Sequence, residues 1–376
     1  MIFFLLLMVL PKLMGEVPSH APLPPLKVCY ISSELGDVLP RANDLPIERA
    51  GFALAVKNYT KNSKNKVSFE VFAGQIKEND VLAGKEWAMK QNCHVAVGLV
   101  TSRDALLFAR SSTEKFSTVG FSSTATADDL DAFFPSVISA ATSMSSWVNA
   151  LKNEVRKMRD VNLYVISKPD DVYSVLFTEK LSFSLGARAQ IIKVNLKNEI
   201  PDAVFNTLKT KEKSIFLYTM YPILSLPSLK QIAGLNSALV KKNWQVYGTH
   251  SWLESHTFNA NGEIASKLPP TFVFTPWQVE KPNALYEIFE REYQLFAHQV
   301  PDHDSAYDYD VMNMIFACYE KYSDFSLTLA EYLKKCLASK RHFEGVTGAY
   351  VYNGFNSHPV RQEYRKQLNF SGKTTK

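Results

Sequence analysis

Short apolar runs alternate with amphipathic segments of helix length from residue 26 to about residue 247. Apolar runs of about four to eight residues bounded by turn residues are typical of strands, whereas helical spacing of apolar residues indicates helices. Strands that alternate with helices predict βαβ units, in which right-handed crossovers place helices on both faces of a parallel sheet. The expected strands are 26–32, 67–72, 95–100, 117–121, 161–166, 190–194, 214–218 and 244–247.

The segments between these strands predict helices. The expected helices are 47–59, 80–91, 103–115, 136–159, 173–185, 201–210 and 226–236. The end of the chain differs, because a strand at 271–274 is followed by three helices and one last strand. Those helices are expected at 284–296, 306–322 and 326–338, and the strand at 346–351.

Two series of strands predict an α/β fold with two doubly wound parallel-sheet lobes. We expect lobe 1 to comprise 26–142 with 273–344, and lobe 2 to comprise 143–272 with 345–376. The length of 376 residues agrees with two domains. Two such lobes enclose a cleft and can close by a hinge motion.

The composition argues against nucleic acid as a partner. Hydrophobic residues make up 46% of the chain and charged residues 21%, which is ordinary for a globular protein. The formal net charge of +5 is scattered, and no basic block carries interleaved aromatic residues.

The first ten residues are almost entirely apolar, and a proline-rich stretch follows at 18–25. A membrane-spanning helix needs about 20 apolar residues, whereas this shorter run fits the apolar core of a secretory signal peptide. We therefore expect residues 1–21 to be a signal peptide and leader, and the chain to be exported to the periplasm. No Lys or Arg precedes the apolar core, so a buried strand or a misplaced start codon remains an alternative. With no second long apolar run, the chain is expected to reach a membrane only through a partner.

The four cysteines form no CxxC pair, and no zinc site is expected. Cys29 lies in an apolar run and Cys93 just before another, so both are expected to be free and buried. In an exported chain Cys318 and Cys336 could form a disulfide between two helices, but the sequence alone does not show whether this disulfide forms.

Small hydroxyl residues follow two consecutive expected strands. Thr101 and Ser102 come after 95–100, and a Ser- and Thr-rich segment, 122–126, comes after 117–121. Ligands of parallel sheets bind at the carboxyl ends of the strands, where hydroxyls and backbone N–H groups suit a polar or anionic group. Ser and Thr also cap helices routinely. Two such clusters after consecutive strands favour a shared binding cleft.

Several short motifs occur in an order and spacing that resemble one family. They are IERAGFALAVKNYTKN (47–62), GLVTS (98–102), GFSSTATADDL (120–130), SAYDYDVMNMIFACYEK (305–321) and ASKRHFEGVTGAYVYNG (338–354). Over nearly all of its length from residue 26, the chain resembles the type I periplasmic solute-binding proteins, the branched-chain amino acid-binding family of ABC importers. The resemblance implies two lobes joined by three crossovers, a small polar solute as ligand and an ABC transporter permease as partner. It implies no catalytic residue, metal or cofactor.

The resemblance also carries over ligand-binding positions. In the family, hydroxyl and backbone groups of the first lobe hold the α-carboxylate of an amino acid, and tyrosines of the second lobe close over the ligand. The matching residues are Ser102, Ser123, Thr124, Ala125 and Thr126 in lobe 1, and Tyr173, Tyr221 and His250 in lobe 2.

Two of the family's acidic positions are not acidic in this chain. His250 stands where the family has the acidic partner of the ligand's amino group, and Ala141 stands about where an aspartate is expected near the first hinge. A buried ammonium without such a partner is costly. We therefore expect weak or no binding of leucine, isoleucine and valine.

Two other functions remain open at this point. One is a ligand-sensing or regulatory envelope protein of the same fold that does not transport. The other is an α/β enzyme with an unrecognised site. No GxSxG, HExxH, Walker A or GxGxxG motif occurs in the sequence, and an enzyme is therefore not expected.

Overall fold

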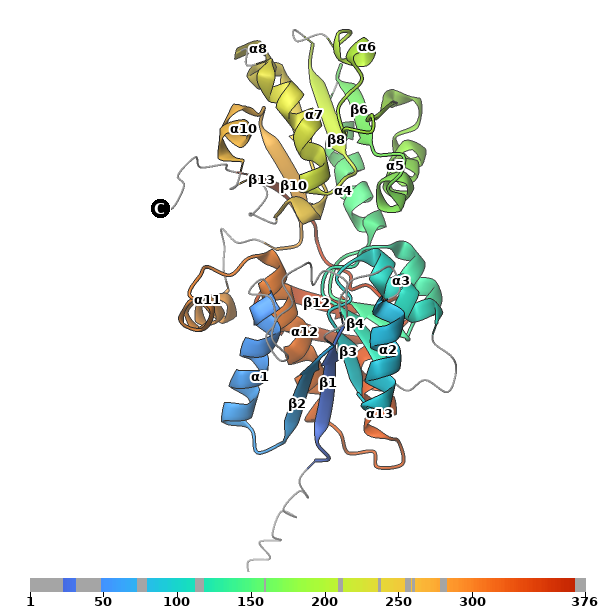
Figure 1. Cartoon of the computed structure of the whole chain (residues 1–376), viewed down its shortest axis with the longest axis vertical. Coiled ribbons are helices and arrows are strands. Elements are labelled where there is room, and N and C mark those ends of the chain that lie inside the picture. Colours follow the sequence, from blue (N-terminus) through green and yellow to red (C-terminus); the bar gives the residue numbers. More distant parts are fainter. Residues whose placement is uncertain are drawn as a thin grey trace, which may run out of the picture.

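The computed structural model describes residues 23–31, 49–72, 80–111, 118–158, 160–208, 212–235, 238–253, 258, 261–277 and 283–368. These residues form two α/β lobes, one above the other in Figure 1, each built on its own sheet. The expected signal peptide lies outside the described residues, as does most of the loop after the first strand. None of the helices described is both long and apolar enough to cross a membrane.

Lobe 1 contains a five-stranded parallel sheet of order β2-β1-β3-β4-β5. Its strands are β1 (Leu26–Tyr30), β2 (Val67–Val71), β3 (Val95–Val97), β4 (Val119–Ser122) and β5 (Val137–Ser139). Helices α2 (Asp80–Lys90) and α3 (Ser102–Arg110) cover one face of the sheet. The other face packs against α1 (Ala50–Asn62), α12 (His303–Tyr319) and α13 (Leu329–Ala338).

Lobe 2 contains a six-stranded sheet of order β13-β10-β9-β8-β6-β7, parallel except for β13. Its strands are β6 (Asn162–Ser167), β7 (Ala189–Lys193), β8 (Ser214–Tyr218), β9 (Trp244–Tyr247), β10 (Thr271–Thr275) and β13 (Tyr364–Gln367). Helices α4 (Met144–Arg156) and α5 (Val172–Leu185) cover one face. The other face packs against α7 (Pro222–Gly234), α8 (Ala238–Asn243) and α10 (Gly262–Lys267), with the short α6 (Asp202–Phe205) nearby. The predicted doubly wound α/β fold is confirmed.

The predicted helix 136–159 is wrong at its start. Residues 137–139 form β5, and α4 begins only at Met144, where the hydroxyl of Ser143 accepts a hydrogen bond from the Ser146 N–H. A three-residue strand is too short to show a period of two, which is why the apolar residues were assigned to the helix. The strands β11 (Arg341–Gly345) and β13 were not predicted either. β11 pairs with β12 (Gly348–Tyr352) as an antiparallel hairpin, and β13 adds to the edge of the lobe 2 sheet.

The chain passes between the two sheets after β5, after β10 and after β12. All of β10 belongs to the lobe 2 sheet, whereas Tyr350 and Tyr352 of the hairpin are buried in the lobe 1 core. The boundaries expected at 272/273 and 344/345 would therefore cut through β10 and β11. The connection after β10 leads to α11 (Ala284–Ala297), which packs against α1.

Helices α1 and α12 approach each other closely at Gly51. A Cβ atom at this position would lie 1.9 Å from the carbonyl oxygen of Ser305, so only glycine fits. This contact holds Arg49, which directly precedes α1, beside the first turn of α12.

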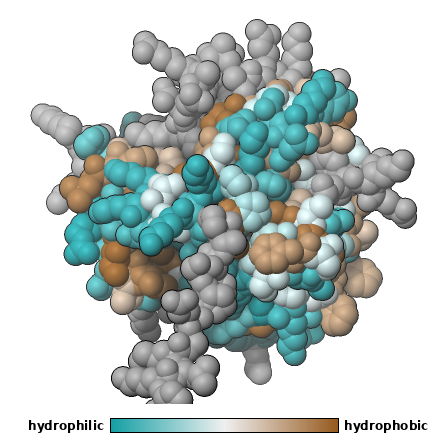
Figure 2. All heavy atoms as spheres, turned by 90° about the horizontal axis from the view of Figure 1, so that it is seen from below, coloured by the Kyte–Doolittle hydropathy of each residue, from teal (hydrophilic) through white to brown (hydrophobic). Residues whose placement is uncertain are grey.

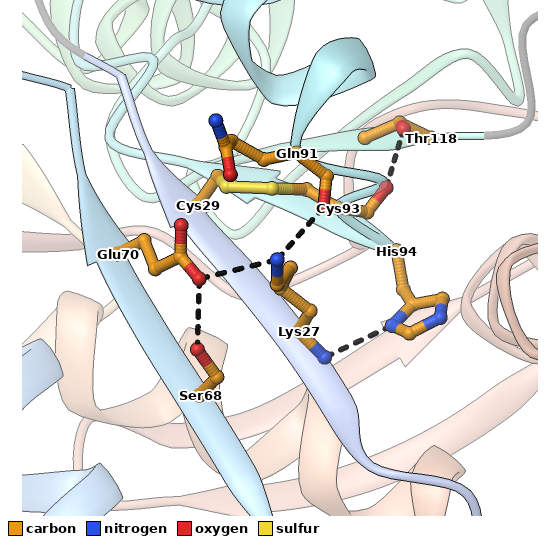
Figure 3. The surroundings of a disulfide bond; sticks show 8 residues. All are labelled: Lys27, Cys29, Ser68, Glu70, Gln91, Cys93, His94 and Thr118. Carbon is orange, nitrogen blue, oxygen red and sulfur yellow. Dashed lines mark hydrogen bonds and ion pairs between the residues drawn. A yellow bond between two sulfur atoms is a disulfide. The ribbon is translucent and has the colours of Figure 1, made fainter.

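All four cysteines are paired, and the prediction that Cys29 and Cys93 are free is wrong. These two residues form a disulfide with a Cα–Cα distance of 5.9 Å (Figure 3). They are 64 residues apart in the sequence but adjacent in space, because β1 pairs with β3. A second disulfide joins Cys318 on α12 to Cys336 on α13.

The outer end of lobe 1 has a mixed surface. Hydrophobic residues on this face occur in small groups among hydrophilic ones (Figure 2). Near the Cys29–Cys93 disulfide, Lys27 forms an ion pair with Glu70, and its ammonium also donates to the carbonyl oxygen of Gln91 (Figure 3). This mixture agrees with the scattered charge of the sequence.

Candidate functional site

A small pocket lies between the two lobes, at the carboxyl ends of the parallel strands. Its lining residues are Val100, Thr101, Ser102, Thr124, His303 and Asp304 from lobe 1, and Tyr173, Tyr221, His250 and Ser251 from lobe 2. The cavity volume is about 30 Å³, which is room for about two water molecules. A solute of several heavy atoms therefore does not fit in this arrangement, and the lobes would have to lie further apart both to admit it and to hold it.

Five of the eight predicted ligand-binding residues line this pocket. Ser102 and Thr124 come from the strand ends of lobe 1, and Tyr173, Tyr221 and His250 come from lobe 2. The sequence placed these residues after five different strands, and the fold brings them together.

The other three predicted residues lie behind the pocket. Ala125 is buried in the lobe 1 core, and the buried Ser123 hydroxyl lies beside the Asp308 carboxyl group. The Thr126 N–H donates to the Ser102 hydroxyl oxygen at 3.1 Å. These positions support the pocket wall.

The hydroxyls after β3 and β4 have structural partners. Thr101 is the N-cap of α3, because its hydroxyl accepts from the Asp104 N–H at 3.0 Å. The Ser102 hydroxyl accepts from two backbone N–H groups, those of Thr126 and Ala127, each at 3.1 Å. An oxygen that accepts twice keeps its own proton to donate. The Ser102 hydroxyl, which belongs to the pocket lining at the start of α3, therefore has a proton to donate.

Two stacked tyrosines form the wall on the lobe 2 side. The rings of Tyr173 and Tyr221 lie 5.2 Å apart with an interplanar angle of 28°. Burial raises the pKa of Tyr173 to about 12, so its phenol is neutral at physiological pH. The pair offers an apolar face with hydroxyl groups at its edge.

A buried polar cluster from α12, missed by the sequence reasoning, completes the lobe 1 side. Arg49 Nη2 lies 3.0 Å from Asp304 Oδ2, and Asp304 Oδ1 lies 3.1 Å from His303 Nδ1. Burial acts to raise the pKa of Asp304, but Arg49 and His303 outweigh it and hold the pKa well below its usual range. The carboxylate is therefore ionised and already paired.

Asp and Ser are typical N-cap residues, so in the segment HDSAYDYD (303–310) the sequence predicts Asp304 or Ser305 as the helix cap. Asp302 is the actual N-cap, and its carboxylate accepts from the Ser305 N–H. Asp304 binds Arg49 instead, a residue 255 positions away, and no pattern in the sequence indicates that contact. Asp308 also faces Arg49, with an oxygen–nitrogen distance of 3.5 Å. Burial raises the pKa of Asp308 to about 8 despite Arg49.

His250 faces His303 across the lobe interface, with ring centroids 5.5 Å apart. Burial, assisted by His303, lowers the pKa of His250 to about 3, so His250 is neutral at physiological pH. It cannot replace the acidic residue that holds an amino group in the family. Near the first crossover, Ala141 is buried; its N–H donates to the Ser139 hydroxyl at 3.1 Å and its carbonyl oxygen lies 3.0 Å from His358 Nδ1.

The described part of the chain holds no group of three or more His, Cys, Asp or Glu side chains that could bind a metal ion.

Two doubly wound lobes with three crossovers and a pocket between facing strand ends define a fold class. The chain has the fold of the type I periplasmic solute-binding proteins, as the sequence motifs predicted.

Solved structures give particular examples of this fold. One is the branched-chain amino acid transporter substrate-binding protein LivJ from Streptococcus pneumoniae in complex with isoleucine, at 15% identity and a TM-score of 0.72, covering 93% of this chain and 97% of that one. Another is a solute-binding protein from Rhodopseudomonas palustris BisB5 in complex with 3,4-dihydroxybenzoic acid, at 16% identity and a TM-score of 0.69, covering 92% and 93%. No family model matches the sequence. None of the curated proteins matches it either.

Proposed function

We propose that this chain is an exported solute-binding protein that closes its two lobes around a small carboxylic acid and presents it to an ABC importer. The observation that carries the proposal is the pocket itself. Residues from both lobes, at the ends of five parallel strands, converge on one small cavity. A pocket made by two lobes is lost when they separate, so a ligand held there stabilises the closed form.

The lobe 1 side suits a carboxylate. The start of α3 supplies helix N-terminal N–H groups, and the Ser102 hydroxyl has a proton to donate. Thr124 lines the same wall, with its hydroxyl donating to the Val100 carbonyl oxygen at 2.7 Å. Structures of the same fold are described in complex with isoleucine, leucine, 4-hydroxybenzoate and benzoate, all of which carry a carboxylate.

Export and transport complete the proposal. Two disulfides fit an oxidising compartment such as the periplasm, where residues 1–21 as a signal peptide would deliver the chain. An ABC transporter permease is the proposed partner, since solved proteins of this fold are named as substrate-binding proteins of ABC transporters. The chain is proposed to catalyse no reaction and to use no cofactor.

The test is a thermal-shift and tryptophan-fluorescence screen of the purified, oxidised protein against small carboxylic acids, amino acids and sugars. A ligand at about 100 times its Kd should stabilise the protein by about 2.7 kcal/mol, which is several degrees in Tm. Small-angle scattering should show a more compact particle, and mass spectrometry should recover the ligand unchanged. Recovery of a converted product, or the absence of any binding solute, would refute the proposal.

A pair of variants distinguishes a hydroxyl that binds the ligand from a hydroxyl that only caps a helix. Ser102→Ala removes a pocket donor and should weaken affinity about tenfold or more, with some loss of Tm, because it also removes an acceptor of two N–H groups. Ser143→Ala removes the cap of α4 and a contact with the Ser146 hydroxyl, and neither residue lines the pocket. This variant should lower Tm without changing affinity.

A further inference from the structure

His303 carries an unused hydrogen-bond acceptor at the pocket. The side chain is 2% exposed, and its Nε2 atom is buried with no hydrogen-bond partner among the described residues. Buried polar atoms in native proteins almost always have a partner, so such an atom in a residue that lines a pocket is a candidate to bind a ligand group. His303 is one of the residues that line the pocket between the lobes.

The neighbours of His303 fix which ring nitrogen carries the proton. Nδ1 lies 3.1 Å from Asp304 Oδ1, and the other oxygen of that carboxylate lies 3.0 Å from Arg49 Nη2. A carboxylate only accepts hydrogen bonds, so Nδ1 must be the donor. In the neutral imidazole the free Nε2 is then an acceptor, and it requires a donor on the ligand.

The same cluster offers no unpaired negative charge. Asp304 is neutralised by Arg49, and burial keeps Asp308, the second carboxyl group at Arg49, mainly protonated at pH 7. His250, on the opposite side of the pocket, is neutral. An ammonium group placed here would lose its hydration without gaining a charged partner, whereas a hydroxyl group would satisfy Nε2 with no charge to bury.

Aromatic rings fix the orientation of the acceptor. The His303 ring lies 4.5 Å from the Tyr307 ring and 5.9 Å from the Trp277 indole, measured between centroids. Both neighbours are buried. Packing of this kind restricts the ring to one orientation, which makes the hydrogen bond selective as well as favourable.

We propose that His303 selects the ligand, and that the ligand is a hydroxy acid: a small carboxylic acid whose hydroxyl group donates to His303 Nε2, with no amino group at that position. The inference rests on the proposed function, because it assigns a chemical class to the same pocket.

The test compares acids that differ at one substituent. An aliphatic set contains 2-hydroxy-4-methylpentanoate, leucine and 4-methylpentanoate, and an aromatic set contains 4-hydroxybenzoate, 4-methylbenzoate and benzoate. In at least one set the hydroxy acid should bind about tenfold or more tightly than both of its analogues by calorimetry. Equal or tighter binding of the analogues in both sets would overturn the inference, as would no binding of either hydroxy acid.

Two substitutions show whether His303 causes the selectivity. In His303→Asn the amide can still donate to Asp304, but nothing reaches the position of Nε2, so the preference for the hydroxy acid should fall about tenfold. His303→Gln places an amide near the position of Nε2 and should keep most of the preference. If both variants keep the wild-type preference, or lose it equally in proportion to their loss of Tm, His303 has only a structural role and the inference fails.

These outcomes remain separate from those of the proposed function. Binding of another solute from the wide screen, with lobe closure but no preference for a hydroxyl group, would leave the proposed function standing and refute only the role of His303. If neither variant folds, the selectivity of the wild-type protein in the two sets still decides the ligand class.

Discussion

Arg49 lies between two carboxyl groups that differ in their ionisation. Its guanidinium is 3.0 Å from Asp304 and 3.5 Å from Asp308, and all three side chains are nearly or fully buried. One cation cannot fully compensate two buried anions, because each ion loses its hydration. The closer carboxyl group stays ionised, whereas burial raises the pKa of the other to about 8.

This difference predicts unequal effects of two matched substitutions. Asp304→Asn removes the charge that compensates Arg49 and should lower the free energy of unfolding by about 3 kcal/mol. Asp308→Asn resembles the protonated acid already present at pH 7 and should change it by less than about 1 kcal/mol. Urea unfolding at pH 7 measures both values. Equal losses would show that Asp308 is ionised in the folded protein.

At the scale of elements, two disulfides constrain lobe 1. Cys29–Cys93 joins β1 to the start of β3 and closes a loop with a sequence separation of 64, whereas Cys318–Cys336 joins α12 to α13 with a separation of 18. A cross-link stabilises mainly by restricting the unfolded chain, and the effect grows slowly with loop length.

Removing each cross-link should therefore destabilise the protein by different amounts. We expect a loss of about 4 kcal/mol for the Cys29→Ala, Cys93→Ala double variant and about 3 kcal/mol for Cys318→Ala, Cys336→Ala. Denaturant unfolding with and without a reductant measures both. Reductant should have no further effect at the altered site, and a wild-type protein insensitive to reductant would contradict the prediction.

At the scale of the whole molecule, an ion pair joins the lobes. Lys180 on α5 of lobe 2 contacts Asp128, which begins the short helix η2 (Asp128–Phe133) of lobe 1, and also donates to the Ser145 hydroxyl at 3.0 Å. Both charged side chains are partly exposed, so the pair is expected to contribute less than about 1 kcal/mol.

The contribution of this pair should appear in affinity. Lys180→Ala should weaken ligand binding about two- to fivefold by disfavouring closure. Lys180→Glu should weaken it further, and the reversed pair Lys180→Glu, Asp128→Lys should recover most of the loss. Calorimetry at low and at high salt measures these effects. A double variant no better than Lys180→Glu would mean that the two charges do not interact in the closed form.

Closure should also depend on pH through His250. In the closed form burial lowers its pKa to about 3, whereas exposure in an open form would restore a value near 6.5. The open form then binds more protons, so closure is fully favoured above about pH 6.5 and weakens as the pH falls toward 3. Ligand affinity should fall up to about tenfold per pH unit below pH 6.5. A His250→Asn variant should lose this dependence, and an unchanged profile in that variant would assign the effect to another group.

The sequence by itself determined most of the strands and helices of both lobes, because buried strands and amphipathic helices leave short-range patterns in apolar residues. It also placed Ser102, Thr124, Tyr173, Tyr221 and His250 after strands, and a parallel sheet brings such positions to one edge. It could not show β5, which lies just before α4 and was merged with that helix, or β11 (RHFEG) and β13 (YRKQ), which contain no apolar run.

Only the tertiary structure decided the contacts between distant residues. The pairing of Cys29 with Cys93 depends on β1 lying beside β3, and the pairing of Arg49 with Asp304 depends on the close approach of α1 and α12 at Gly51. The contact between Arg49 and Asp304 also places the Asp304 carboxylate beside His303. Nδ1 of His303 bonds to this carboxylate, and Nε2 has no hydrogen-bond partner among the described residues. Local sequence encodes which face of an element is apolar, whereas the partner of a buried polar group depends on how elements far apart in the chain pack together.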